Sequence, residues 1–110
     1  MKLENIEKAL ISSEKLRNYL LSPSHPVGRF KSVFFRSLGY SQSESDQLEA
    51  DIRKILLNDV EKKEDTPYGK KYIIRGNITG PSKRTTEIVT VWIILNGEDF
   101  PRFVTAYPGD

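Results

Sequence analysis

Apolar residues recur at helical spacing near the start of the chain. Ser12 or Ser13 can cap a helix that runs to Leu21, and the proline at position 23 ends it, because a residue before proline resists the α conformation. The apolar positions that share one face of this segment are Leu16, Tyr19 and Leu20. The pattern predicts a short amphipathic helix.

Two further segments carry the same period. The stretch RFKSVFFRSLGY predicts a mostly buried helix, with Phe30, Phe34 and Leu38 in line, Val33 and Phe35 beside them, and Gly39 as a left-handed C-cap. The stretch SESDQLEADIRKILLNDV predicts a third helix that Ser43 or Ser45 caps. Its core stripe comprises Leu48, Ile52, Ile55 and Leu56.

The second half of the chain changes to a two-residue period. KKYIIRGNI alternates, TEIVTVWIIL is a nearly continuous apolar run typical of a strand buried on both faces, and PRFVTAY alternates again. Tyr72, Ile74 and Ile78 should face one side of the first strand, and Arg75 the other. The Asn-Gly pair in NGEDF favours a turn with positive φ. Successive strands joined by short turns predict an antiparallel meander.

These elements predict one α+β domain over residues 1–110. Helices at about 4–58 should pack on one face of a sheet of three to four strands at about 68–108. A length of 110 residues suits one hydrophobic core. There is no cysteine and no run of apolar residues long enough for a signal peptide or a membrane span, so we expect a cytoplasmic protein without membrane contact.

Charge is unevenly distributed along the sequence. The stretches Lys15–Arg36 and Lys70–Arg84 each carry five cations and no acid, whereas Glu44–Asp65 carries eight acids against four cations. A solvated surface is one interpretation of such runs, and a nucleic-acid contact is the other. In the second interpretation, the candidate RNA-binding residues are Arg29, Lys70, Lys71, Lys83 and Arg84.

His25 is the only histidine, and it lies in the stretch HPVGRFK. Histidine is the residue type whose unperturbed pKa lies near neutral pH, so His25 is the first candidate for proton transfer, although a histidine between Ser24 and Pro26 can also be a simple turn residue. Gly28 allows close backbone approach, and a following helix N-terminus with Arg29 and Lys31 favours an anion. This combination suits phosphodiester transfer.

Other chemistries find little support. One histidine and no cysteine disfavour zinc, the acids lack the spacing of a calcium loop, and no phosphate-binding P-loop motif is present. We therefore expect no metal and no cofactor.

The stretches EKLRNYLLSPSHPVGRFKSVFF, YGKKYIIRGNITGP and PRFVTAYP, in this order, resemble an uncharacterised family of bacterial toxin-like domains, commonly encoded beside a small antitoxin. More distantly, helices followed by an antiparallel sheet ending in VTAYP resemble the barnase, EndoU, colicin and RelE-type ribonucleases. Members of that superfamily cleave RNA, usually without metal, by attack of the ribose 2′-hydroxyl on the adjacent phosphate.

The resemblance implies catalytic roles for five residues. His25 would be an acid or base, Lys31 and Arg75 would stabilise the phosphate, and Thr105 and Tyr107 would donate hydrogen bonds or stack on bases. A second acid–base group stays open among Lys31, Lys70, Tyr107 and Glu87. Arg75 can alternatively be an ordinary surface salt-bridge residue.

The resulting hypothesis is a metal-independent endoribonuclease toxin that acts on RNA and has a small antitoxin protein as partner. The first alternative is a noncatalytic module that binds RNA or a protein through the same basic face. The second alternative is a structural or inhibitor domain, whose binding to a protein should be insensitive to salt, unlike binding to RNA.

Overall fold

The computed structural model describes residues 1–22, 24–26 and 29–109, with the backbone alone at residues 29 and 30. Short helical turns occur at Ile6–Lys8, Leu16–Leu20 and Gln42–Glu44, the second of them with π geometry. The remaining elements are α1 (Ser13–Lys15), α2 (Arg29–Ser37), α3 (Ser45–Ile55), β1 (Val60–Asp65), β2 (Gly69–Thr79), β3 (Thr85–Leu95) and β4 (Arg102–Pro108). Helices precede strands along the chain, which confirms the predicted α+β class.

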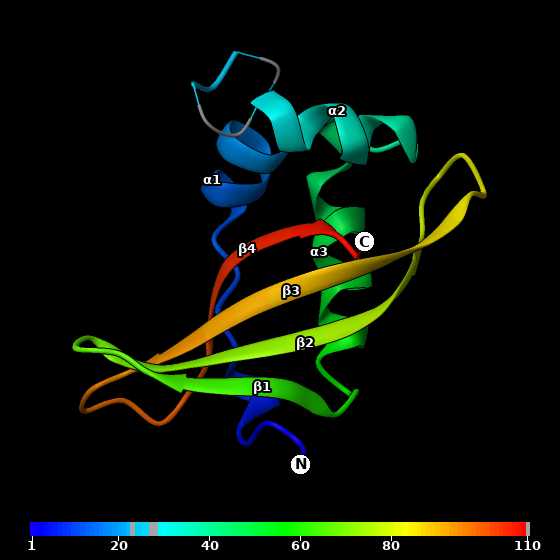
Figure 1. Cartoon of the computed structure of the whole chain (residues 1–110). Helices are drawn as coiled ribbons and strands as arrows, with labels where there is room; N and C mark the ends of the chain where they lie inside the picture. The colour runs from blue at the N-terminus through cyan, green and yellow to red at the C-terminus, as the bar shows by residue number, and fades with distance from the viewer. Residues whose placement is uncertain (23, 27–28, 110) are drawn as a thin grey trace.

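The four strands form one antiparallel meander in the order β1-β2-β3-β4 (Figure 1). Helix α3 packs on β2, and α1 and α2 lie beyond the β4 side of the sheet (Figure 1). The N-terminal segment runs beside the outer strand: the Leu10 N–H donates to the Pro101 carbonyl at 3.0 Å, and the Phe103 N–H donates to the Leu10 carbonyl at 2.8 Å. The segment therefore covers the start of β4.

The alternation predicted for β2 and the burial predicted for β3 are both confirmed. Tyr72, Ile74 and Ile78 are buried towards the helices. Every residue from Ile88 to Trp92 is buried, so both faces of the central strand are covered. Burial of the Thr90 hydroxyl is compatible with stability because it donates to the Ile74 carbonyl at 2.8 Å and accepts from the Trp92 indole at 2.8 Å.

The predicted cap and turn residues are largely confirmed. Ser12 accepts a hydrogen bond from the Lys15 N–H at 3.5 Å at the start of α1. Gly39 follows α2 with φ of 99°, and Gly97 adopts φ of 84° in the turn before β4. The Ser43 or Ser45 cap is wrong, because Glu44 precedes α3 without a side-chain cap and Ser45 is itself helical.

Helix α2 is less buried than the pattern predicted. Phe35 and Leu38 are fully buried, but Val33 is 71% exposed. The buried side also includes Ser32, a polar residue that the apolar pattern could not reveal. The C-terminal end of α2 is held by the β2–β3 turn, where both the N–H and the hydroxyl of Ser82 donate to the Leu38 carbonyl at 3.0 and 2.8 Å.

Strand β1 lies between the predicted helices and the predicted sheet, in a segment for which the sequence predicted neither. Helix α3 stops at Ile55, and the charged sequence VEKKED forms the strand at the edge of the sheet. Charged side chains are typical of edge strands because they discourage further pairing. They also remove the alternation by which a strand is recognised in a sequence.

Candidate functional site

One pocket lies where the first helical segment, the following loop and β4 meet. Its volume is about 670 Å³. It is lined by Ser12, Glu14, Lys15, Asn18, Tyr19, His25, Val104 and Thr105. Two residues predicted to be catalytic, His25 and Thr105, therefore line the same pocket although 80 positions separate them in the sequence.

Lys31 joins this group from the first turn of α2. Its ammonium donates to the Tyr19 hydroxyl at 2.8 Å and to the Thr105 hydroxyl at 2.9 Å. Both partners are neutral, and in the described part of the chain no carboxylate forms an ion pair with Lys31. A half-buried positive charge therefore persists beside the pocket.

Tyr19 lies at the centre of this group. Its ring meets the His25 ring edge to face, with 5.1 Å between the centroids. Burial raises the pKa of the Tyr19 phenol, but hydrogen bonds with Lys31 and Thr105 and the charges of Lys31 and Lys15 outweigh it, so the pKa lies below its usual value. The phenol loses its proton more readily than an ordinary tyrosine.

An irregularity in β4 lies directly before Thr105. Val91 pairs with Thr105 and the next residue, Trp92, pairs with Phe103, so Val104 is an extra residue in the strand. Such bulges bend a strand and redirect its side chains. The Val104 carbonyl accepts a hydrogen bond from the Lys15 ammonium at 2.9 Å, which ties the bulge to the first helix.

A second irregularity positions Tyr19. Residues Leu16–Leu20 form a π turn, closed by a hydrogen bond of 2.9 Å from the Leu21 N–H to the Leu16 carbonyl. Such turns accommodate an extra residue and occur often at functional sites. The flanking Leu16 and Leu20 side chains are buried in the core and anchor the turn, while Tyr19 is left half-exposed towards the pocket.

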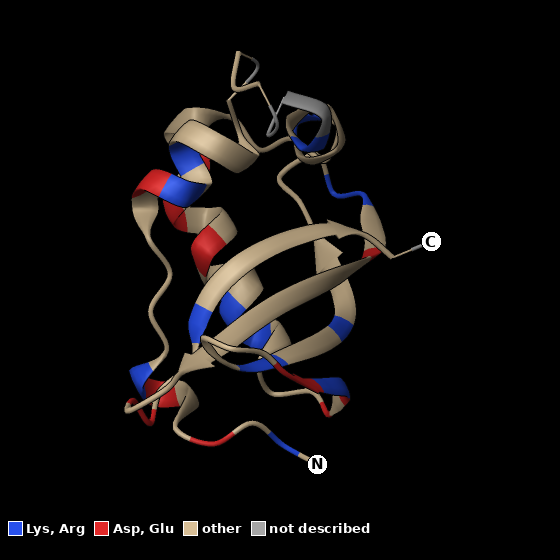
Figure 2. Cartoon of the chain, turned by 60° about the vertical axis from the view of Figure 1, so that its left-hand side comes forward, with Lys and Arg blue, Asp and Glu red and all other residues tan. Residues whose placement is uncertain are grey.

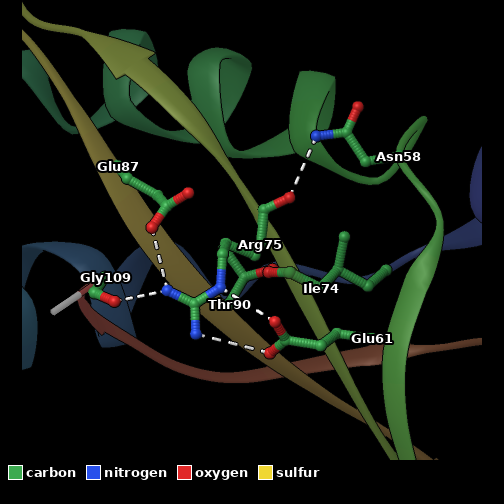
Figure 3. A network of polar contacts seen from close by, with 7 residues as sticks. All are labelled: Asn58, Glu61, Ile74, Arg75, Glu87, Thr90 and Gly109. Carbon is green, nitrogen blue, oxygen red and sulfur yellow. Dashed lines mark hydrogen bonds and ion pairs between the residues drawn. The ribbon is translucent and has the colours of Figure 1, made fainter.

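Arg75 belongs to a different group of polar contacts (Figure 3). Its guanidinium donates to Glu61 at 2.9 Å, to Glu87 at 2.9 Å and to the Gly109 carbonyl. Glu61 comes from β1 and Glu87 from β3, so three strands and the C-terminal segment meet here. Arg75 does not line the pocket, and its contacts are those of the salt-bridge alternative.

The other predicted residues also lie apart from the pocket lining. Tyr107 is on β4 opposite Val89, which pairs with Arg75 in turn. Lys70 and Lys71 lie at the start of β2, opposite Asp65 and Glu64 of β1.

Lys83 and Arg84 lie in the turn at the opposite end of the β2–β3 hairpin (Figure 1). Figure 2 shows basic and acidic residues interspersed along the chain. The predicted RNA-binding residues of β2 and of its hairpin turn thus form two separate sets.

The HPVGRFK stretch is described in part. Gly28 and the side chain of Arg29 lie outside the described residues. His25 is half-buried, and it lines the pocket in addition to contacting Tyr19.

Sequence reasoning missed Tyr19 and Lys15 as site residues. Tyr19 was interpreted as part of an apolar helical face, which it also is, because its ring packs against the core. The available signal was the i,i+4 spacing of Lys15 and Tyr19, which places a cation and a phenol on one side of a helix. That spacing is too common to identify a site without the position of β4.

The described residues contain neither a metal-binding cluster nor a membrane-spanning helix. They contain no group of three or more histidine, cysteine, aspartate or glutamate side chains arranged to hold a metal ion. None of the described helices has the length and apolar character needed to span a bilayer.

Comparisons with known proteins give one family and a similar fold. A chain from the contact-dependent growth inhibition toxin–immunity protein complex of Klebsiella pneumoniae 342 is similar in structure, with a TM-score of 0.70 and 20% sequence identity over 89% of this chain and 97% of the other. Among proteins of curated function, none matched the sequence. The family model described as "Domain of unknown function (DUF6883)" matches residues 2–110, and the chain belongs to this family.

Proposed function

We propose that this protein is an endoribonuclease toxin that cleaves RNA by attack of the ribose 2′-hydroxyl on the adjacent phosphate, with His25 transferring a proton. The observation that carries the proposal is the position of Lys31. Its charge is balanced by no described carboxylate, and it lies beside a pocket lined by His25 and Thr105. A site with one titratable imidazole and one fixed cation suits a phosphoryl group whose oxygens gain charge during the reaction.

The geometry supports a role for each of these residues. Lys31 and Thr105 would contact the phosphoryl oxygens, because an ammonium has three donors and only two have partners among the described residues. Lys15, at the rim of the pocket, would attract the backbone of the RNA. Arg75 is left out of this proposal because two carboxylates already balance its charge.

The toxin role is supported by the fold. The similar structure comes from a complex of a toxin with its immunity protein. By analogy, a small protein partner would bind this chain and block the pocket in the producing cell. The predicted contacts of Lys70, Lys71, Lys83 and Arg84 with RNA remain predictions, and they would extend binding beyond the pocket.

The test is incubation of total RNA with the wild-type protein and with His25→Ala, in the presence of a chelator, followed by mapping of the cut ends. We expect cleavage that leaves 2′,3′-cyclic phosphate ends and a loss of about two orders of magnitude or more in the variant. Lys8→Ala, an exposed residue outside the pocket, is the matched control and should cleave like the wild type. Intact RNA in every reaction, with salt-sensitive binding retained, would indicate a noncatalytic RNA-binding module instead.

A further inference from the structure

We propose that Tyr19 is the second acid–base residue of this pocket, acting as general acid while His25 acts as general base. The inference rests on the proposed ribonuclease function. Tyr19 and His25 line the same pocket with their ring centroids 5.1 Å apart, so both can reach one bound phosphodiester. Of the four groups that the sequence left open for this role, none lines the pocket, although Lys31 contacts the hydroxyls of Tyr19 and Thr105, which do.

The surroundings of Tyr19 suit an acid. A general acid must release its proton as the leaving oxygen gains charge, and donors directed at its own oxygen stabilise the anion that results. The Lys31 ammonium lies 2.8 Å from the Tyr19 oxygen. As the proton leaves, this hydrogen bond becomes charge-assisted at both ends.

The groups that face Tyr19 are mostly cationic or neutral. Lys15 comes from α1, Lys31 from α2, His25 from the connecting loop and Thr105 from β4. Glu14 is the only acid that lines the pocket in the described part of the chain. Hydrogen bonds and positive charge together outweigh the effect of burial, and the lowered pKa of Tyr19 agrees with the geometry.

Lys31 fits a supporting role better than that of the acid. Two of its N–H groups are directed at the Tyr19 and Thr105 hydroxyls. A proton transferred from Lys31 to the substrate would remove the positive charge that contacts both hydroxyls. Besides contacting the phosphoryl oxygens, Lys31 would therefore stabilise the Tyr19 phenolate.

The reaction is balanced with these two residues alone. Neutral His25 takes the proton of the 2′-hydroxyl, the bond from the 2′-oxygen to phosphorus forms, and the bond from phosphorus to the 5′-oxygen breaks. Tyr19 gives its proton to the departing 5′-oxygen. The products are a 2′,3′-cyclic phosphate and a 5′-hydroxyl, and the protein is left with a His25 imidazolium and a Tyr19 phenolate that exchange a proton through water.

Tyr19→Phe tests the proposal because it removes the hydroxyl and keeps the ring that packs against His25. We expect RNA cleavage to fall by about 10²- to 10⁴-fold. Tyr68→Phe is the matched control, since Tyr68 is 75% exposed in the β1–β2 turn and should retain wild-type activity.

The second substrate is a nucleoside 3′-(4-nitrophenyl phosphate), whose leaving group departs without a proton. Tyr19→Phe should cleave it within a few-fold of the wild-type rate.

The outcomes separate three possibilities. Equal losses on both substrates would show that Tyr19 only maintains the pocket, and unchanged RNA cleavage would show that another group is the acid. Either result overturns the proposal while leaving the ribonuclease function intact. A wild-type protein that cleaves neither substrate would overturn the proposed function, and this inference with it.

The pH dependence of the wild-type protein gives a test that needs no variant. An acid acts only when protonated, so RNA cleavage should decline as the pH rises through the pKa of Tyr19. The 4-nitrophenyl substrate should show no such decline, because it needs no acid. A decline of equal size with both substrates would contradict the proposal.

Discussion

Lys31 and Arg75 are both half-buried cations bound by residues from other elements, yet their electrostatic surroundings are opposite. Lys31 contacts two neutral hydroxyls. Arg75 contacts two carboxylates and a carbonyl, and hydrogen bonds to Glu61 and then Glu87 raise its pKa above the usual value. A phosphate that approaches Lys31 meets positive charge, whereas one that approaches Arg75 meets two negative charges. The residue type alone therefore does not identify an anion-binding cation.

The two groups also differ in what they join. The Arg75 group connects β1, β2, β3 and the C-terminal segment, all within or beside the sheet (Figure 3). The Lys31 group connects a helix, a loop and the edge strand, which come from distant parts of the sequence. The first is an arrangement that stabilises a sheet, and the second encloses space for a ligand.

Among the changes that compare the two groups, loss of Lys31 should have the largest effect. Lys31→Met removes the charge and keeps most of the apolar stem, and we expect RNA cleavage to fall by about 10²- to 10³-fold. Arg75→Met, the equivalent change in the other group, should cleave RNA at nearly the wild-type rate and unfold at a slightly lower temperature. Single-turnover cleavage and thermal unfolding followed by circular dichroism measure the two effects. Equal losses of cleavage in both variants would remove the distinction between the groups.

The second prediction concerns a variant in which Lys31, like Arg75, has a carboxylate partner. Thr105→Glu would place a carboxylate beside the Lys31 ammonium, and we expect RNA affinity to fall by about ten- to a hundredfold, or roughly 1.4 to 2.8 kcal/mol. Thr105→Val is the control, because it removes the hydroxyl without adding charge. It should weaken the free energy of RNA binding by about 1 kcal/mol. Fluorescence anisotropy with a labelled RNA measures both, and a smaller loss for the glutamate than for the valine would contradict the charge argument.

The converse change should have a smaller effect. Glu61→Gln combined with Glu87→Gln keeps hydrogen-bonding groups around Arg75 and removes their negative charge. RNA affinity should rise a few-fold, and its dependence on salt should become steeper by at most about 0.7 per additional phosphate contact. Titrations at several salt concentrations in a His25→Ala background avoid cleavage. Unchanged RNA affinity would show that RNA does not approach the Arg75 group.

The titration of Tyr19 is the prediction with the smallest expected effect. Its phenol should ionise at lower pH than an ordinary tyrosine, whereas burial, together with a hydrogen bond to Asp51 and the charge of that carboxylate, raises the pKa of Tyr40. Ultraviolet difference titrations of the wild type against Tyr19→Phe and Tyr40→Phe isolate the two phenols. Lys31→Met should move the Tyr19 transition to higher pH and leave that of Tyr40 unchanged, and a Tyr19 transition above that of Tyr40 would be contrary to expectation.

Local chemistry made much of the fold predictable. The Ser12 cap, the positive φ of Gly39 and Gly97, and the alternation in β2 each follow from one or a few neighbouring residues. Strand β1 escaped prediction because its six residues include five charged ones and their stability comes from pairing with β2. An edge strand is specified by its partner more than by its own pattern.

The site was predictable only in part. His25 and Lys31 were identified from the HPVGRFK stretch, the family resemblance gave them and Thr105 catalytic roles, and the structure brings the three together. Tyr19 was not identified because its role depends on a π turn and on a bulge in a strand 85 residues away, neither of which has a sequence signature. The sequence also placed Arg75 in this site. Its two carboxylate partners lie 14 and 12 residues away on neighbouring strands, so the sequence does not reveal that they balance its charge.

The extra residue in β4 has a consequence for how this family can change length. Deletion of Val104 would leave Phe103 and Thr105 as consecutive residues opposite Trp92 and Val91, which is a regular ladder. The same deletion would remove the carbonyl that anchors Lys15, a residue of the pocket lining. A shorter strand would make a better sheet and a poorer pocket, so natural selection for activity, rather than for folding, would preserve this position against deletion.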